Sequence, residues 1–156
     1  MDYAQLLAAM HKRFSGNWAV LVRMHPNVSY KDYPLTYTDR ILNASPYENM
    51  QELLATADFI ISDYSGCIFD FLMQEKPGFL YAEDYAEMKR TKDYYFDLQN
   101  LPYPLAFSNE ELMSLIENFS QEEFDRKCQE FLSDFEFYDN GHAAEAVVDL
   151  ILEKMA

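Results

Sequence analysis

Three short polar segments carry the residues of this sequence that are best suited to chemistry. Each follows an apolar stretch, and the segments are His25-Pro26-Asn27, Ser62-Asp63-Tyr64-Ser65-Gly66 and Ala82-Glu83-Asp84. An imidazole can transfer a proton or stabilise charge at a phosphate near neutral pH. Serine hydroxyls and backbone amides beside a glycine can hold an anion. Adjacent carboxylates can bind a divalent cation, although at a strand end they more often belong to a solvated turn.

Apolar periodicity predicts how these segments are placed. Nearly continuous apolar runs predict strands over 18–24, 58–62 and 79–82, with shorter candidates at 40–43 and 105–107. Helical spacing covers 2–14, 48–57, 65–74, 109–119, 121–134 and 142–155, whereas 28–39 and 83–104 lack a clear period. This alternation predicts one α/β domain over residues 1–156, with a parallel sheet and helices on both faces. Ligands bind at the carboxyl ends of such strands, so the polar segments should line one crevice.

The segment from Ser62 to Gly66 is the best candidate for an anion site. It joins a buried strand to a helix whose first backbone amides should point into the crevice. The Ser65 hydroxyl can donate to a phosphate oxygen, and Gly66 permits close approach of the backbone. Capping of the helix by Ser65 without a ligand is slightly favoured, because no established glycine-rich fingerprint is present. For Asp70, a local hydrogen bond is favoured over a ligand contact.

The three histidines lead to different predictions. His25 follows the most apolar strand, and two interpretations are equally good: chemistry at a phosphate, or a bond to the neighbouring loop. His142 follows Asp139-Asn140-Gly141 at the start of the last helix, where a helix cap is favoured over a second anion site. His11 lies in an amphipathic helix and is predicted to be structural.

The charge of the chain excludes several classes of partner. With 12 Lys and Arg against 27 Asp and Glu, the net charge is −15. Proteins that bind nucleic acid or anionic lipid electrostatically need clustered basic residues, so neither class fits. The acids are densest in residues 109–156, which hold 13 acids and 3 bases, against 14 and 9 in residues 1–108. Aromatic residues make up 16%, which argues against disorder.

Cysteine usage and hydropathy predict a cytoplasmic protein. Cys67 and Cys128 lie in apolar helical patterns without zinc-ligand spacing, which indicates free buried thiols in a reducing compartment. No apolar run reaches the about 20 residues of a membrane span. The first residues lack the basic start and the apolar stretch of a signal peptide.

The ordered set of motifs resembles the CDP-glycerol glycerophosphotransferases of teichoic acid synthesis. Each motif alone is weak, but the order is specific and extends from about residue 18 to residue 155. The motifs are His25-Pro26-Asn27, the run from Ala57 to Gly66, Phe69-Asp70-Phe71, Lys76-Pro77 before Phe79-Leu80-Tyr81, Tyr95-Phe96-Asp97 before Leu101-Pro102, and Asp139-Asn140-Gly141.

This resemblance implies a fold and a reaction. Members of the family resemble GT-B glycosyltransferases, in which two Rossmann-like halves face a cleft. The chain would be the C-terminal, donor-nucleotide-binding half of a longer two-domain transferase. The reaction would move glycerol phosphate from CDP-glycerol to a hydroxyl of a growing polymer and release CMP.

The resemblance also assigns residues to the site. His25 would be the family histidine near the transferring phosphate. The residues that would bind the donor phosphates and nucleotide are Asp63, Tyr64, Ser65, Gly66, Asp70, Asp139, Asn140 and Gly141. The resemblance assigns no residue to a metal and implies no cofactor.

The chain departs from the family pattern at several positions. Gly66 stands where a second serine is usual, and Asn140 where aspartate is frequent. Ala143, Ala144 and Ala146 replace small polar and basic residues. A second family histidine, within a threonine-proline motif upstream of His25, has no counterpart in this sequence.

Two other functions fit the same residues. A GT-B nucleotide-sugar glycosyltransferase domain would share the scaffold and prefer UDP-sugars. A non-catalytic interaction module would keep a degenerate nucleotide site and dock a partner through its acidic surface. Transfer by the isolated chain is not expected, because the N-terminal acceptor-binding half is missing. That half, expected to be more basic, should supply the acceptor and membrane contacts at the inner face of the plasma membrane.

Overall fold

Strands and helices alternate along the chain in the computed structural model, which describes residues 1–25, 35–91, 97–135 and 141–155. In chain order the elements are α1 (Tyr3–Phe14), β1 (Val20–Val22), β2 (Ile41–Asn43), α2 (Met50–Thr56), β3 (Ile60–Ser62), α3 (Cys67–Leu72), β4 (Gly78–Tyr81), α4 (Tyr85–Thr91), the 3-10 helix η1 (Leu98–Asn100), β5 (Leu105–Ala106), α5 (Asn109–Glu117), α6 (Gln121–Asp134) and α7 (Ala143–Met155). Every strand expected from the apolar runs is present; β4 has the predicted length and begins one residue earlier, and the others are shorter than their runs.

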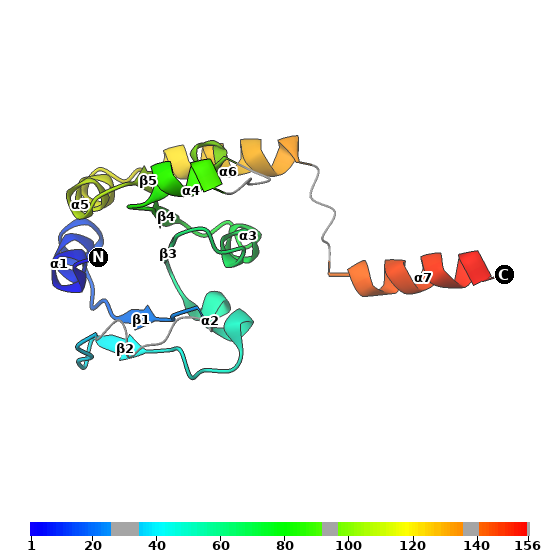
Figure 1. The fold of residues 1–156 in the computed structure, drawn as a ribbon, viewed down its shortest axis with the longest axis horizontal. Helices are drawn as coiled ribbons and strands as arrows, with labels where there is room; N and C mark the ends of the chain where they lie inside the picture. Colours follow the sequence, from blue (N-terminus) through cyan, green and yellow to red (C-terminus); the bar gives the residue numbers. More distant parts are fainter. Residues whose placement is uncertain (26–34, 92–96, 136–140, 156) are drawn as a thin grey trace.

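The described strands pair in parallel, as predicted, but they form two sheets and not one. β1 pairs with β2, and Leu21 lies opposite Leu42. In the second sheet β4 lies between β3 and β5. Figure 1 shows α1 and α5 on one side of the β3–β4–β5 sheet and α3 on the other. The α/β class and the helices on both faces are therefore confirmed.

Side-chain caps fix where several helices begin. The Asp2 carboxylate accepts hydrogen bonds from the backbone amides of Ala4 and Gln5, both at 3.0 Å. The Ser108 hydroxyl accepts from the Glu111 amide at 3.2 Å, and the Glu111 carboxylate accepts from the Phe107 amide at 2.7 Å. These contacts satisfy amides that have no partner inside the helix. They confirm the starts predicted for α1 and α5.

The core is built around β4, the strand with a neighbour on each edge. Phe79 and Leu80 of β4 are 0% exposed, and α3 and α5 bury side chains against them, among them Phe71 and Leu112. A parallel strand covered on both faces is apolar throughout, and the β4 sequence from Gly78 to Tyr81 follows that rule. The core therefore belongs mainly to the β3–β4–β5 sheet and its helices.

An aromatic cluster ties α1 to the second sheet. Phe14 at the end of α1 lies 4.7 Å from Phe59, measured between ring centroids, and Trp18 lies 5.7 Å from the same ring. Phe59 in turn contacts Phe119 at 5.9 Å. Tilted and edge-on aromatic pairs of this kind stabilise a fold beyond the area that they bury. The cluster holds the segment between α1 and β1 against the start of β3.

The segment 83–104 is more regular than its sequence indicates. It contains α4 and η1, whereas the lack of periodicity predicts an irregular stretch. Long-range contacts explain the difference. Tyr85 of α4 is buried and its ring lies 5.5 Å from that of Phe107, while its hydroxyl donates to Asp97. The prediction of a loop over 28–39 falls mostly outside the described residues, and 35–39 form neither helix nor strand.

Asp97 joins α4 to η1 and should make the stability depend on acid pH. Its carboxylate accepts from Lys89 at 2.6 Å, from the Tyr85 hydroxyl and from the Gln99 amide. These bonds, that from Lys89 above all, lower the pKa of Asp97 to about 2. Because this pKa is lower in the folded than in the unfolded chain, the stabilisation exists above about pH 4 and is lost as the pH falls towards 2.

We therefore expect Asp97→Asn to lower the melting temperature at pH 7 by a few degrees. The difference from the unchanged protein should shrink steadily between pH 4 and pH 2 in thermal unfolding followed by circular dichroism. Asp134→Asn, at an exposed position at the end of α6, provides the matched control and should show no such convergence. A difference that stays constant down to pH 2 would contradict the role of the Asp97 charge.

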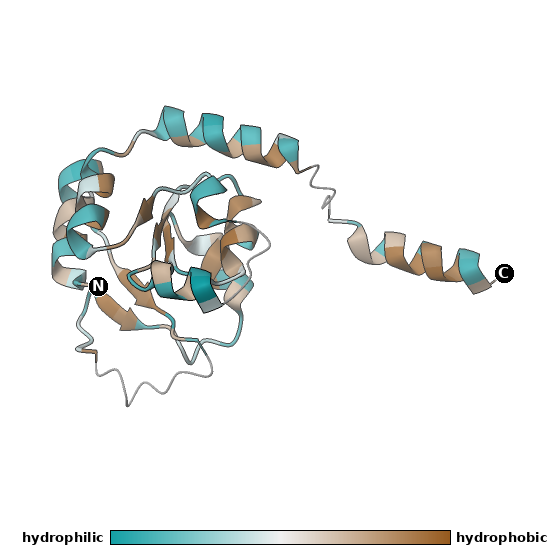
Figure 2. Cartoon of the chain, turned by 45° about the horizontal axis from the view of Figure 1, so that its top comes forward, coloured by the Kyte–Doolittle hydropathy of each residue, from teal (hydrophilic) through white to brown (hydrophobic). Residues whose placement is uncertain are grey.

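The last helix lies apart from the strands. α7 projects away from the rest of the described chain in Figures 1 and 2, and none of its residues is buried. Its apolar side chains are mostly more than half exposed, among them Val147, Leu150 and Leu152. The predicted helix over 142–155 is confirmed. Within the described ranges, no helix has the length and hydropathy needed to span a membrane.

Candidate functional site

The turn between β3 and α3 is the centre of the candidate site. Ser62 ends β3, Asp63 is exposed, and Tyr64 and Ser65 are half-buried. The helix cap is Gly66, with φ −61°, and no side chain donates or accepts as the cap. The interpretation that Ser65 caps α3 is therefore wrong, because α3 starts one residue later. Ser65 contacts the helix through its backbone carbonyl and not through its hydroxyl. The carbonyl accepts a hydrogen bond from the Ile68 amide at 3.3 Å.

Gly66 leaves open space at this turn. A Cβ atom built on Gly66 meets no heavy atom of its surroundings within 4 Å. The backbone is thus open to close approach by a ligand, as the sequence predicts. Because α3 has only six residues, its dipole contributes little to anion binding. An anion at this turn must therefore be bound by the amides and hydroxyls of the turn itself.

Two of the three predicted segments meet at the carboxyl end of this sheet. The Tyr64 hydroxyl, after β3, donates to the Asp84 carboxylate, after β4, at 2.7 Å. The Tyr81 hydroxyl donates to Glu83 at 2.5 Å. Burial and the Glu83 carboxylate raise the pKa of Tyr81, so this phenol keeps its proton. Both carboxylates after β4 therefore accept from a tyrosine, which suits the solvated turn that the sequence favours for them.

His25 is the third member of the predicted crevice. It follows β1, as predicted, and its side chain is exposed. The end of β1 is anchored by the Met24 amide, which donates to the Ser45 hydroxyl at 3.0 Å, and by Arg23, which donates to the carbonyl of Ala44. His25 thus lies at a strand end, in the sheet separate from β3. Pro26 and Asn27 lie outside the described residues.

The remaining predicted residues are not gathered at this turn. Asp70 is exposed on α3, and its backbone carbonyl accepts from Gln74 at 3.5 Å. Gly141 precedes α7 with φ +82°, and that helix lies away from the strand ends (Figure 1). His142 contacts Glu145 at 3.0 Å within α7, a local contact at the helix start. Asp139 and Asn140 lie outside the described residues.

The described residues show no cluster of three or more His, Cys, Asp or Glu side chains that would hold a metal ion. Both cysteines are free thiols, as predicted. Cys128 is buried, which raises the pKa of its thiol to about 11, and Cys67 is half-buried. A buried thiol with a raised pKa is a poor nucleophile, so the role of Cys128 is to pack in the core.

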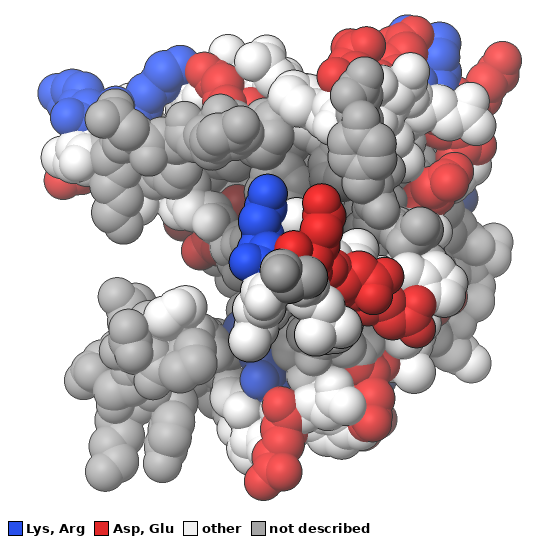
Figure 3. Space-filling model, turned by 90° about the vertical axis from the view of Figure 1, so that its right-hand side faces the viewer, with Lys and Arg blue, Asp and Glu red and all other residues white. Residues whose placement is uncertain are grey.

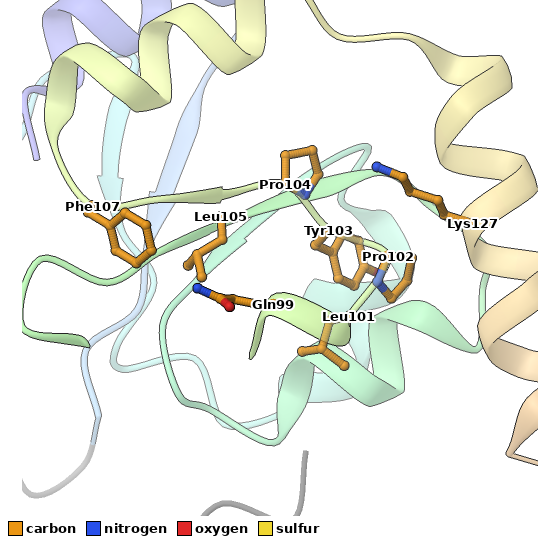
Figure 4. Close-up of a pocket in the computed structure, with 8 residues that line it drawn as sticks. All are labelled: Gln99, Leu101, Pro102, Tyr103, Pro104, Leu105, Phe107 and Lys127. Carbon is orange, nitrogen blue, oxygen red and sulfur yellow. The ribbon is translucent and has the colours of Figure 1, made fainter. Parts of the chain in front are cut away.

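A shallow cavity of about 270 Å³ lies elsewhere, beside β5 (Figure 4). Leu101, Pro102, Tyr103 and Pro104 line it together with Lys127 of α6 and three further side chains. Its lining is mixed polar and apolar, and it has no acid or histidine. Sequence reasoning did not identify this cavity, although the proline-flanked run 101–104 is a signal of irregular backbone. Its one cationic side chain, Lys127, is paired with Glu123 at 2.8 Å, so the turn after β3 remains the better candidate.

One face of the described chain is predominantly acidic. Figure 3 shows the face towards which α7 projects, and acidic side chains predominate there over Lys and Arg. Two exposed ion pairs lie along α6: Arg126 with Glu130 at 2.7 Å, and Lys127 with Glu123 at 2.8 Å. Such exposed pairs add little to stability. These pairs engage Arg126 and Lys127, which are the two cationic side chains of α6.

Comparison with known proteins agrees with the motif order. The chain is 29% identical over 147 residues to the teichoic acid poly(ribitol-phosphate) polymerase of Bacillus spizizenii, and the match covers 92% of this chain and 23% of that protein. It is 27% identical to the teichoic acid poly(glycerol phosphate) polymerase of Staphylococcus epidermidis, covering 91% of this chain and 20% of that protein. The chain thus spans less than a quarter of the length of these two relatives.

Solved structures extend the agreement to the fold. The wall teichoic acid polymerase TagF matches with a TM-score of 0.69 and 25% identity, covering 95% of this chain and 37% of that chain. A histidine variant of TagF, solved after soaking with CDPG, matches equally well, with a TM-score of 0.69. The model of the CDP-Glycerol:Poly(glycerophosphate) glycerophosphotransferase family matches residues 3–153. Since that match includes nearly all of the 156 residues, the chain belongs to this family.

Proposed function

We propose that this chain is the donor-nucleotide-binding part of a glycerophosphotransferase that moves glycerol phosphate from CDP-glycerol to a teichoic acid acceptor. The observation that carries the proposal is the turn from Ser62 to Gly66, open to a ligand at the carboxyl end of β3, in a chain of this family. The relatives named above are polymerases of glycerol phosphate or ribitol phosphate, which supports a donor of the nucleotide–polyol class.

The residues have distinct roles in this proposal. Asp63, Tyr64, Ser65 and Gly66 line the donor pyrophosphate, and the amides of the turn donate to its oxygens. The Asp84 carboxylate holds the Tyr64 hydroxyl at 2.7 Å and so fixes one wall of the turn. Asp70 and the segment Asp139-Asn140-Gly141 complete the nucleotide site. For Gly141, which lies just before α7, this requires that the start of α7 approach the turn when the donor binds.

The transfer itself exchanges one phosphorus–oxygen bond for another. The acceptor hydroxyl oxygen bonds to the phosphorus that carries glycerol, and the bond from that phosphorus to the CMP oxygen breaks. CMP leaves with the electron pair. His25 receives the proton of the hydroxyl or stabilises charge at the phosphate, as a histidine at this position can. The acceptor is held by the part of the transferase that this chain does not include.

The acidic surface supports the proposal that this chain binds the donor and that the rest of the transferase binds the acceptor. An anionic donor can bind an acidic domain when uncharged amides and hydroxyls hold its phosphates locally. An anionic polymer acceptor is repelled by the 13 acids of residues 109–156. We therefore place the acceptor and membrane contacts on the more basic remainder of the transferase.

Titration calorimetry of the 156-residue chain tests the donor site. We expect CDP-glycerol and CMP to bind weakly, with dissociation constants of about 1 mM, and UDP-sugars to bind less well. Preference for a UDP-sugar would favour a nucleotide-sugar glycosyltransferase. The absence of heat with any cytidine nucleotide at millimolar concentration would contradict the donor site and favour an interaction module.

Gly66→Ser should strengthen donor binding. The new side chain enters open space, so the turn need not move, and its hydroxyl can donate to a phosphate oxygen. One such bond raises the affinity for CDP-glycerol about fivefold, measured by the same calorimetry. Gly66→Ala is the matched control, because it adds the Cβ atom without the hydroxyl. Equal affinities of the serine and alanine variants would argue against a phosphate at this turn.

A further inference from the structure

Two pairs of tyrosine and carboxylate adjoin each other just after β4. The Asp84 carboxylate accepts from the hydroxyl of Tyr64, in the turn after β3, at 2.7 Å. Tyr85, the next residue of the chain, donates from its own hydroxyl to Asp97. In the proposed donor site the first pair forms one wall of the turn, whereas Asp97 has no part in it. Because Asp84 and Tyr85 share a peptide bond, a shift of one pair also moves the other.

The backbone of Asp84 belongs to the start of α4. Its carbonyl accepts from the amide of Glu87 at 2.9 Å and from that of Met88 at 3.0 Å, which are the first hydrogen bonds of this helix. These bonds tie Asp84 to the helix, so its carboxylate takes the position that α4 gives it. What holds α4 therefore also decides where the hydroxyl of Tyr64 finds its acceptor.

Asp97 holds α4 at two points of one face. Tyr85 is the one buried residue among the seven of this helix, and its ring lies 5.5 Å from that of Phe107. The Asp97 carboxylate accepts from the Tyr85 hydroxyl and, at 2.6 Å, from the ammonium of Lys89, one helical turn later. That ammonium also lies 5.6 Å from the centroid of the Tyr85 ring. With so little of α4 buried, these two bonds carry much of its attachment to the sheet.

Asp97 is itself fixed to the core. Its carboxylate accepts from the Gln99 amide at 3.1 Å and so caps η1. Leu98 within η1 and Leu101 directly after it are buried, with 6% and 7% of their surface exposed. The bonds to Asp97, that from Lys89 above all, lower its pKa to about 2, so the carboxylate is ionised at neutral pH. Hydrogen bonds to an ionised group are stronger than those between neutral groups, which makes this a firm anchor.

We infer that Asp97 is a positioning residue for the turn from Ser62 to Gly66. It fixes α4, α4 fixes the carboxylate of Asp84, and that carboxylate holds the hydroxyl of Tyr64. The consequence for binding rests on the proposed function: a nucleoside diphosphate meets a turn whose wall is in place before it arrives. A site that is ordered in advance binds more tightly, because no ordering cost is paid on binding.

Nitrogen–proton correlation NMR of the ligand-free chain tests the connection. Asp97→Asn removes the charge and should shift the amide signals of Tyr64, Ser65 and Gly66, while the signal of Phe79 in β4 stays in place. In a chain that carries Tyr64→Phe, the turn no longer donates to Asp84. There the same replacement of Asp97 should leave the signals of Ser65 and Gly66 where they are, because the link through the hydroxyl has been cut.

Tyr85→Phe is a milder second variant with its own control. It removes one hydroxyl and keeps the ring on Phe107, and it should shift the same signals of the turn as Asp97→Asn does. Tyr47→Phe removes a hydroxyl of the same kind elsewhere, because Tyr47 is exposed and donates to Glu52 at 2.5 Å beside α2. This control should leave the signals of the turn unchanged.

Donor affinity provides a readout that a purely structural role of Asp97 would not move. In a titration followed by the same signals, Asp97→Asn should weaken the binding of CDP-glycerol about three- to tenfold, but less than about twofold in a chain that carries Tyr64→Phe. If Asp97 only stabilised α4, its replacement would lower the melting temperature and leave the affinity of the folded chain unchanged.

Three results would overturn the inference: signals of the turn that do not respond to Asp97→Asn, equal shifts with and without Tyr64→Phe, and an unchanged affinity for a donor that does bind. If Asp97→Asn also shifts Phe79, the same criteria apply to Tyr85→Phe. A chain that binds no cytidine nucleotide contradicts the proposed donor site alone, because the signals of the ligand-free chain still decide the role of Asp97. Shifts that vanish with Tyr64→Phe support it.

Discussion

Replacing Gly78 by alanine should lower the free energy of unfolding by about 1–3 kcal/mol. Gly78 opens β4 and lies opposite Ile60 of β3. A Cβ atom at this position would stand 2.5 Å from Cγ2 and 2.6 Å from the carbonyl oxygen of Ile60, and 3.2 Å from the Tyr103 ring. The side-chain methyl can rotate, but the carbonyl belongs to the β3 backbone. β3 and β4 must therefore separate locally to admit one methyl group.

Gly66→Ala is the matched control for this prediction. It makes the same chemical change at a position with open space and helical backbone angles, so its stability should be unchanged or slightly raised. Urea unfolding followed by fluorescence of Trp18 measures both variants. If Gly78→Ala unfolds at the same urea concentration as Gly66→Ala, a Cβ atom at position 78 does not press against the backbone of Ile60, and the contact argued here is contradicted.

The positions of the strand ends follow from local signals. The apolar run 18–24 stops before Pro26, which cannot continue a ladder, and β1 and β2 lie where such runs predict them. Ser108 with Glu111 three residues later marks the start of α5 in the sequence and in the structure. These signals place His25 and the turn from Ser62 to Gly66 at strand ends without any knowledge of tertiary contacts.

Contacts between distant residues explain what the sequence leaves open. The bond from Tyr64 to Asp84 joins residues twenty positions apart, and no local pattern distinguishes it from two exposed turns. α4 forms because Tyr85 packs on Phe107 and donates to Asp97, not because of helical periodicity. The division into two sheets is of the same kind. Strand length and hydropathy predict that β1 and β3 are strands, but which strands pair depends on contacts between distant residues.

The largest effect on activity is expected at His25. In a transferase that joins residues 1–156 to the acceptor-binding part, His25→Ala should reduce kcat by about 10²–10⁴, the usual contribution of a general acid or base. The KM for CDP-glycerol should change much less, because in the proposed site amides and hydroxyls of the turn hold the pyrophosphate. Release of CMP in the presence of a teichoic acid primer measures both constants. His25 is exposed beyond β1, so its replacement leaves the core intact.

His11→Ala controls for the loss of an imidazole as such. His11 is exposed on α1 and its Nδ1 lies 2.9 Å from the Gly16 carbonyl, which is a local contact at the helix end. We expect this variant to keep the kcat of the unchanged transferase. A His25→Ala transferase that keeps more than about a tenth of that kcat has no general acid or base at His25, since such groups contribute at least about a hundredfold. The histidine would then serve its neighbouring loop, and the chemistry would depend on groups in the remainder of the transferase.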